Sequence, residues 1–120
     1  MEAWQPRTSW AGGEDEAVRY LERRGLVVLS RNWRCRDGEL DVVATDAKRL
    51  VVCEVKTRSG TRFGEPAEAV TNRKAARIRR VTQAWLAAHQ VRWCEIRFDV
   101  VAVLMEPGRP ATLRHYEAAF

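Results

Sequence analysis

The sequence predicts an α/β protein: a mixed sheet with a three-strand antiparallel meander, flanked by helices in the order α-β-β-β-α-β. Three observations predict this fold. Two segments carry apolar residues at helical spacing, three consecutive segments rich in Val and Leu are joined by short turns, and a late segment reads as a long apolar strand. No repeat or linker divides the chain, so we expect residues 12–120 to form one domain.

The first helix is expected over residues 14–24. Ala17, Val18 and Leu21 fall at helical spacing, and Gly25 is a natural stop. Residues 1–11 mix Trp, Pro, Thr and Ser without periodicity, so they are expected to form a flexible N-terminal arm.

The meander is expected in three consecutive strands, at residues 26–33, 39–45 and 49–57. Turn-forming residues at positions 36–38 and 46–48 predict the two connections. A loop containing glycine then interrupts the pattern at residues 59–66.

The second helix is predicted by the longest periodic segment, residues 72–89. Ile78, Val81 and Trp85 lie on one of its faces. Asn72 is expected to cap its start, because its side chain can accept a hydrogen bond from a free main-chain N–H.

Two further strands complete the predicted sheet. Residues 95–105 alternate at first and then become continuously apolar, which is typical of an interior strand covered on both faces. Residues 112–116 are expected to add a short edge strand. Trp85 and Trp93 are expected to fill the core.

Composition excludes several classes of protein. The 120 residues carry 21 Lys and Arg against 16 Asp and Glu, a net charge of +5, and 46% are hydrophobic, too many for a disordered tail protein. The longest apolar run, residues 100–105, is much shorter than the roughly 20 residues that cross a bilayer. No signal-peptide core is visible and the three cysteines form no CxxC pair, so we expect a cytoplasmic protein with reduced thiols. The basic excess favours a polyanionic partner.

Charged residues interrupt the third strand of the meander. Side chains alternate between the faces of a strand, so Glu54 and Lys56 share one face, with Cα atoms roughly 7 Å apart. Burying an ionised group is costly unless it is paired or binds a metal. For these two residues alone, an ion pair on a half-exposed sheet and a functional site are both reasonable interpretations.

The second strand carries a matching acid, Asp41. If Ala47 and Lys48 form the tip of the turn, Asp41 lies opposite Glu54 with Cβ atoms about 5 Å apart. Two carboxylates this close repel each other unless a cation lies between them, and Mg²⁺ accepts one or two carboxylates together with waters and a phosphate. A slip of one residue would place Asp41 on the other face. In the register expected here, Asp41, Glu54 and the main-chain carbonyl of Val55 are candidate metal ligands.

The chemistry that fits these residues is phosphodiester hydrolysis. A metal held by Asp41 and Glu54 would lower the pKa of a bound water and stabilise charge on the phosphoryl oxygens. Lys56 would position the nucleophile or offset the developing negative charge. The candidate catalytic residues are therefore Asp41, Glu54 and Lys56.

Two stretches of sequence carry a resemblance to known proteins. Gly38-Glu39-Leu40-Asp41, followed by Glu54-Val55-Lys56-Thr57-Arg58, resembles the bipartite motif of the PD-(D/E)xK nuclease superfamily, with Leu40 where the literal signature has Pro. The pattern from about residue 13 to residue 103 resembles the YraN-like family of uncharacterised bacterial proteins. The matching stretches include Gly13-Glu14, Arg31-Asn32-Trp33-Arg34, Phe63-Gly64-Glu65-Pro66, Lys74 and Arg97-Phe98-Asp99-Val100.

The resemblance implies a restriction-endonuclease-like fold, also described as Holliday-junction-resolvase-like. It also implies that Asp41 and Glu54 bind Mg²⁺ or Mn²⁺ and that Lys56 is catalytic. Glu14 matches an extra acidic residue that some members bring to the metal from the first helix. The alternative for Glu14 is a carboxylate in the first helical turn that stabilises the helix dipole.

Basic residues gather in the middle of the chain. Arg73, Arg77 and Arg80 share one face of the second helix, either as a solvated surface or as phosphate contacts with a measurable salt dependence. Aromatic and basic residues also mix around Trp33, which suits stacking with single-stranded or branched DNA. The candidate DNA-binding residues are Arg34, Arg36, Arg58, Arg62, Arg73, Lys74, Arg77 and Arg80.

These features together predict a DNA endonuclease that depends on Mg²⁺ or Mn²⁺ and acts on branched or otherwise structured DNA. The alternative is a non-catalytic nucleic-acid-binding module that needs a partner for activity. A homodimer is left open, because a junction resolvase needs two sites.

Overall fold

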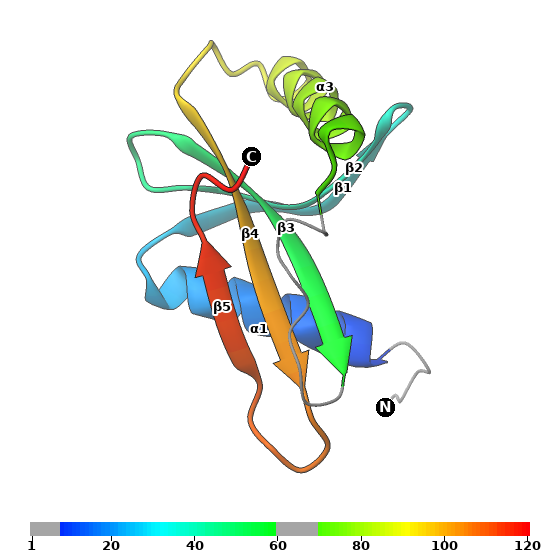
Figure 1. Cartoon of the computed structure of the whole chain (residues 1–120). Coiled ribbons are helices and arrows are strands. Elements are labelled where there is room, and N and C mark those ends of the chain that lie inside the picture. The colour runs from blue at the N-terminus through cyan, green and yellow to red at the C-terminus, as the bar shows by residue number, and fades with distance from the viewer. Residues whose placement is uncertain (1–7, 60–69) are drawn as a thin grey trace.

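The computed structural model describes residues 8–59 and 70–120, with side chains from residue 12 onward. Its elements are α1 (Thr8–Arg23), β1 (Val27–Cys35), β2 (Gly38–Thr45), β3 (Leu50–Ser59), α3 (Asn72–Ala88), β4 (Ile96–Met105) and β5 (Thr112–Tyr116). The strands form one sheet in chain order, in which β3 and β4 are parallel and the other neighbours are antiparallel (Figure 1). The predicted α/β class and element order are confirmed. Most of the predicted loop and the first seven residues of the predicted arm lie outside the described residues.

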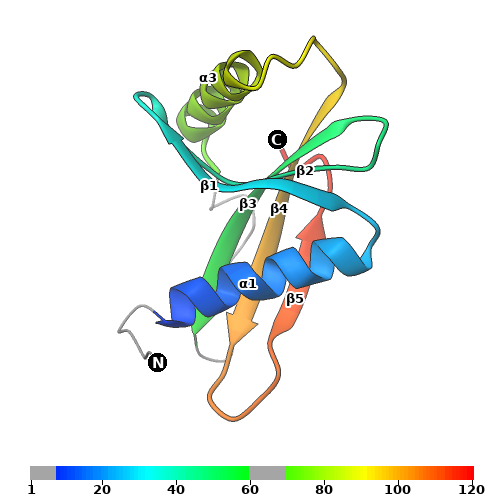
Figure 2. The same ribbon diagram turned by 180° about the vertical axis from the view of Figure 1, so that it is seen from behind.

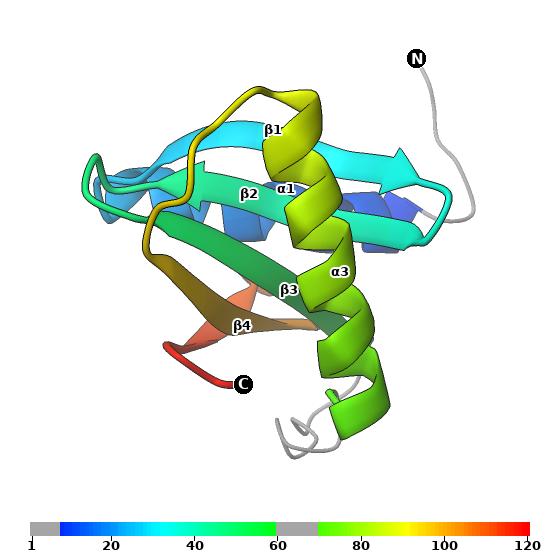
Figure 3. The ribbon, with the colours of Figure 1, turned by 90° about the horizontal axis from the view of Figure 1, so that it is seen from above.

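The two helices cover opposite faces of the sheet. Figure 2 shows α1 crossing in front of β3, β4 and β5, and Figure 3 shows α3 on the other side, over β1 and β2. Each helix closes its own apolar cluster. The α1 cluster contains Ala17, Val18, Leu21, Val42, Ala44, Cys53, Val101 and Val103. The α3 cluster contains Leu40, Val43, Leu50, Val52, Ile78, Val81, Trp85 and Leu86.

The helix ends correct two predictions. Helix α1 begins at Thr8, inside the segment expected to be an arm, and stops as predicted at Gly25, whose φ of +92° suits a residue without a Cβ. The N–H of Leu26 donates to the carbonyl of Leu21 at 3.1 Å and completes the cap. The prediction that Asn72 caps α3 is wrong: Asn72 is already helical, and Thr71 is the N-cap.

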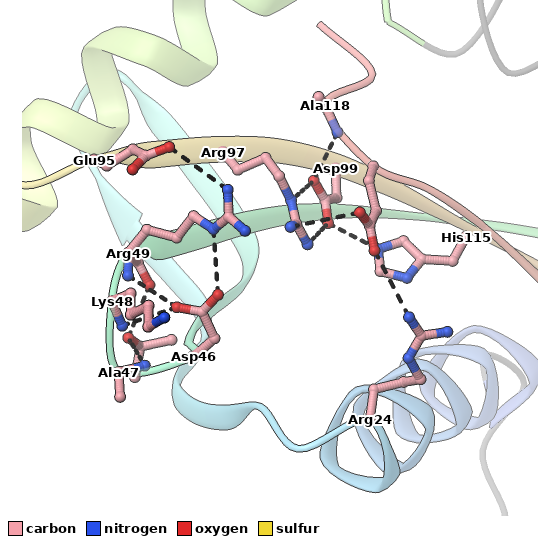
Figure 4. Close-up of polar contacts among 12 residues, drawn as sticks. Arg24, Asp46, Ala47, Lys48, Arg49, Glu95, Arg97, Asp99, His115 and Ala118 are labelled. Carbon is pink, nitrogen blue, oxygen red and sulfur yellow. Dashed lines mark hydrogen bonds and ion pairs between the residues drawn. The ribbon is translucent and has the colours of Figure 1, made fainter.

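The turn between β2 and β3 sets the register that the sequence predicts. The carboxylate of Asp46 accepts the N–H groups of Lys48 and Arg49, both at 2.9 Å (Figure 4). The ladder then runs through the pairs Thr45–Leu50, Ala44–Val51, Val43–Val52 and Val42–Cys53. Asp41 and Glu54 are the next two residues in that register, as predicted.

A charged network ties β4 to β5 and to α1. Asp99 is fully buried and accepts hydrogen bonds from Arg97 at 2.8 and 2.9 Å and from the N–H of Ala118 at 3.0 Å (Figure 4). His115 Nε2 lies 2.7 Å from the same carboxylate, and its Nδ1 lies 3.0 Å from the hydroxyl of Tyr20 on α1. Burial raises the pKa of Asp99, but these hydrogen bonds outweigh it and lower the pKa below its usual value.

The two tryptophans expected in the core have different environments. Trp85 is 2% exposed and donates to the hydroxyl of Ser30 at 3.0 Å. The prediction for Trp93 is wrong: it is 80% exposed, because it lies in the connection between α3 and β4, which neither helix covers. Neither helix in the described part of the chain is long and apolar enough to cross a membrane.

Candidate active site

A cleft of about 900 Å³ opens where Glu14 of α1 and the first two turns of α3 approach β1, β2 and β3. Its lining is rich in charge of both signs. The acids are Glu14, Glu39, Asp41 and Glu54, and the bases are Arg31, Arg34, Lys56, Lys74 and Arg77. The remaining lining residues are Asn32, Val55, Thr57 and Ile78. All three predicted catalytic residues therefore line one cleft.

An irregularity in the sheet accompanies Asp41. Leu40 packs in the α3 cluster and Val42 in the α1 cluster, whereas strict alternation would put both on the same face. On the neighbouring strand, Asn32 has a φ of +51°, which asparagine tolerates better than most residues. The ladder of β1 and β2 pairs the residues on either side of Asn32 and Asp41 but not these two. The alternation of side chains along β2 is therefore interrupted at Asp41, and the residues on either side of it face opposite sides of the sheet.

Asp41 is held by the neighbouring strand. Its Oδ2 accepts the main-chain N–H of Val55 at 2.9 Å, just beyond the last pair of the β2–β3 ladder. Burial raises the pKa of Asp41 most, the N–H of Val55 opposes the rise, and the charges of Glu14 and Glu39 add to it. Lys74 also opposes it. The carboxylate is therefore oriented by the main chain but stabilised poorly as an anion.

Glu54 is the more deeply buried of the two acids, with only 5% of the residue exposed. Burial and then the charge of Asp41 raise its pKa from 4.5 to about 7, although Lys74 and Lys56 oppose the rise. The Nζ of Lys74 lies 3.4 Å from Glu54 Oε1. Two neighbouring carboxylates with raised pKa values favour the binding of a further cation.

Lys56 shares the cleft with both acids. Burial lowers its pKa most, followed by the positive charges of Lys74 and Arg58, while Glu54 and Asp41 act in the opposite direction. The ammonium therefore gives up its proton more readily than that of an ordinary lysine.

Glu14 reaches the cleft from α1 and is anchored by β1. Its carboxylate accepts the side-chain amide of Asn32 at 2.5 Å and lies 3.5 Å from the guanidinium of Arg31, which also pairs with Asp15 at 2.6 Å. The alternative that Glu14 stabilises the first helical turn is wrong, because α1 begins at Thr8. Glu14 is close enough for its charge to raise the pKa of Asp41.

The donor set suits a metal that prefers oxygen. Asp41 and Glu54 supply carboxylates, and Val55, whose main-chain carbonyl is the third predicted ligand, lines the same cleft. Within residues 12–59 and 70–120, no three or more His, Cys, Asp or Glu side chains form a group that could hold a metal ion. A site with two carboxylates, a carbonyl and waters fits Mg²⁺ or Mn²⁺ better than Zn²⁺, which favours four nitrogen or sulfur ligands.

The predicted DNA-binding residues divide into several groups. Arg34, Lys74 and Arg77 line the cleft, and Arg34 also lies 3.6 Å from Glu39. Arg36, Arg58, Arg73 and Arg80 lie outside the cleft lining. Arg62 lies outside the described residues.

Sequence reasoning missed two side-chain contacts, of which the second lies in the cleft. Trp33 is partly buried against the α3 cluster and contacts the ring of His89, so it is not the free stacking platform that the sequence suggested. The contact between Lys74 and Glu54 was also missed. A signal for it exists in the sequence: the first turn of α3 has cations and no acid, which is unfavourable at the positive end of a helix dipole.

Comparisons with known proteins come from a family model, curated relatives and solved structures. Residues 13–103 match the model of uncharacterised protein family UPF0102. The UPF0102 protein of Frankia alni is 56% identical over 108 residues, covering 90% of each chain, and that of Nocardia farcinica is 52% identical over 110 residues, covering 92% of this chain and 87% of its own. A similar solved structure is that of Hjc, a Holliday junction resolvase from Archaeoglobus fulgidus. It has 13% identity and a TM-score of 0.47 and covers 87% of this chain and 72% of its own.

Proposed function

The chain belongs to uncharacterised protein family UPF0102, as its resemblance to YraN-like proteins predicted, and we propose that it is a metal-dependent DNA endonuclease. One observation carries the proposal. Two carboxylates with raised pKa values, Asp41 and Glu54, share an open cleft with Lys56 and a rim of basic side chains. Family membership assigns no activity, so the proposal depends on this geometry.

Asp41 and Glu54, with the carbonyl of Val55, would hold Mg²⁺ or Mn²⁺. The bound ion would acidify a water and stabilise charge on the phosphate. The N–H of Val55 keeps the carboxylate of Asp41 in one orientation, at 2.9 Å. Glu14, anchored by Asn32, would add negative charge beside Asp41 without acting as a third carboxylate ligand.

Lys56 would act directly on the substrate. Its lowered pKa leaves it able to exchange a proton with a water or a leaving oxygen, and as an ammonium it offsets charge on the phosphate. Its place two residues from Glu54 on β3 fixes it beside the carboxylates.

DNA would be bound by the basic rim and by the exposed face of α3. Arg34, Lys74 and Arg77 would contact phosphates at the cleft, and Arg73 and Arg80 would extend the contact along the helix. Among the described residues, Arg73, Arg77 and Arg80 form no ion pair, so these cations are available to phosphates. Branched or structured DNA is the proposed substrate, and a homodimer would supply the two sites that cleavage of a junction requires.

A non-catalytic nucleic-acid-binding module is the alternative. The ion pair between Lys74 and Glu54 favours it, because a carboxylate neutralised by lysine has less need of a metal. The same basic rim would then bind DNA without cleaving it.

One experiment separates the two functions. The protein is incubated with Mg²⁺ or Mn²⁺ and with labelled duplex, single-stranded, flap and four-way-junction DNA, beside Asp41→Asn and Glu54→Gln. We expect each variant to lose at least about 100-fold in cleavage rate, which corresponds to roughly 3 kcal/mol of lost transition-state stabilisation. Asp37→Asn is the control, since this acid is exposed in the β1–β2 turn outside the cleft lining.

The outcomes are distinct. Binding of DNA without cleavage of any substrate by the wild type would support the binding module. Cleavage that persists undiminished in both acid variants would show that a contaminant or another site is responsible.

A further inference from the structure

The ammonium of Lys74 lies against the most deeply buried acid of the cleft. Its Nζ is 3.4 Å from Glu54 Oε1, and the side chain of Glu54 is only 6% exposed. Among the described residues, no other basic side chain forms an ion pair with Glu54. The side chain of Lys74 is itself 36% exposed, so its ammonium borders both the buried carboxylate and the open cleft.

The start of α3 holds Lys74 in this place. The main-chain N–H of Lys74 donates to the hydroxyl of Thr71 at 3.1 Å, and the N–H of Ala75 donates to the carbonyl of Thr71 at 2.8 Å. The first turn contains no acid to offset its cations and the helix dipole. A local arrangement that costs helix stability is typical of a residue placed for a site.

The charge of Lys74 acts on all three candidate catalytic residues. It opposes the rise in the pKa values of Asp41 and Glu54. After burial, it is also the largest cause of the lowered pKa of Lys56. Lys74 is therefore part of the electrostatic balance of the cleft as well as of its rim.

We propose that Lys74 is a built-in competitor of the divalent metal: its ammonium neutralises Glu54, and it leaves that carboxylate for the substrate's phosphate when the metal binds. This inference rests on the proposed function. The ammonium of Lys74 already lies 3.4 Å from Glu54 Oε1, so a divalent ion placed on this carboxylate would repel it. The 36% exposure of Lys74 gives it a path into the cleft, where phosphate would lie.

The test is a titration with Mn²⁺ alone, followed by calorimetry or by electron paramagnetic resonance of free Mn²⁺. Lys74→Met removes the charge and keeps much of the side-chain volume. We expect it to bind Mn²⁺ about tenfold more tightly than the wild type, because one nearby charge changes the affinity of a carboxylate for a proton by about that factor or more. Lys74→Arg, which keeps the charge, is expected to bind within about twofold of the wild type.

Arg80→Met is the matched control, since it removes one charge from an exposed position on the same helix outside the cleft lining. Its affinity for Mn²⁺ should equal that of the wild type. Circular dichroism and the melting temperature in EDTA establish that every variant is folded before titration.

A second measurement tests whether the ammonium of Lys74 contacts DNA once a metal has displaced it from Glu54. The affinity for a fluorescein-labelled DNA duplex is measured in EDTA and in Ca²⁺. The affinity lost in Lys74→Met should be greater in Ca²⁺ than in EDTA, whereas the loss in Arg77→Met should be the same in both. Equal losses for Lys74→Met in the two conditions would overturn the transfer of Lys74 to the substrate.

The results separate this inference from the proposed function. Mn²⁺ affinity in Lys74→Met that is equal to or weaker than in the wild type overturns the competition alone. A wild type and a Lys74→Met variant that both fail to bind Mn²⁺ overturn the proposed metal dependence, and the competition with it.

Discussion

Replacing Glu54 by glutamine should stabilise the protein at alkaline pH. The residue is 5% exposed, and burial with the charge of Asp41 raises its pKa from 4.5 to about 7. A raised folded-state pKa contributes stability that is fully present below pH 4.5 and is lost as pH rises through about 7. Each pKa unit is worth about 1.4 kcal/mol, so the loss amounts to about 3 kcal/mol. Because glutamine does not ionise, the Glu54→Gln variant does not lose this stability as the pH rises.

Urea denaturation in EDTA at pH 5 and pH 8 measures this effect. We expect the free energy of unfolding of Glu54→Gln to exceed that of the wild type by about 3 kcal/mol at pH 8 and by under about 1 kcal/mol at pH 5. Glu22→Gln, at an exposed position on α1, serves as the control and should change stability by less than about 0.5 kcal/mol. A Glu54→Gln variant no more stable than the wild type at pH 8 would refute the reasoning, because the protein would then already stabilise the buried charge.

Two further substitutions test the scaffold. Asp99→Asn should lower the free energy of unfolding by about 3 kcal/mol in urea at pH 7, because the half-buried guanidinium of Arg97 loses its fully buried counter-charge; a loss below about 1 kcal/mol would contradict this. Gly13→Ala should cost about 2 kcal/mol by the same measurement, since the new Cβ would overlap Thr57 Oγ1 and lie 2.8 Å from its Cγ2. Gly12→Ala, whose Cβ would meet only an ordinary contact at 3.4 Å, should cost less, and equal losses at the two glycines would refute the close approach.

Local chemistry made much of the fold predictable. The hydrogen bonds of Asp46 determine the conformation of the β2–β3 turn. This turn determines the register of the two strands, in which Asp41 and Glu54 follow directly after the last ladder pair. Gly25 ends α1 because it adopts a positive φ. Such features depend on a few neighbouring residues and are visible in the sequence.

Features that depend on distant residues were not predictable. The contact of Lys74 with Glu54 joins a helix to a strand far from it in sequence. The cations in the first turn of α3 indicate a special role for that turn, but no spacing rule identifies Glu54 as the partner. The change of face between Leu40 and Val42 contradicts strict alternation, the rule on which the strand prediction was based. Trp93 is exposed because it lies in the connection into β4, away from both apolar clusters, although tryptophan is a large apolar side chain for which burial is expected.

The change of face at Asn32 and Asp41 also determines which substitutions can disturb the cleft. Leu40 of β2 packs in the α3 cluster and Val42 packs in the α1 cluster. The strand that carries Asp41 is therefore held by packing on both faces of the sheet. The two clusters contribute Glu14 and Lys74 through the helices that cover them. Repacking either helix would therefore move one wall of the cleft relative to the other. Both apolar clusters thus help to hold Asp41 and Glu54 in position.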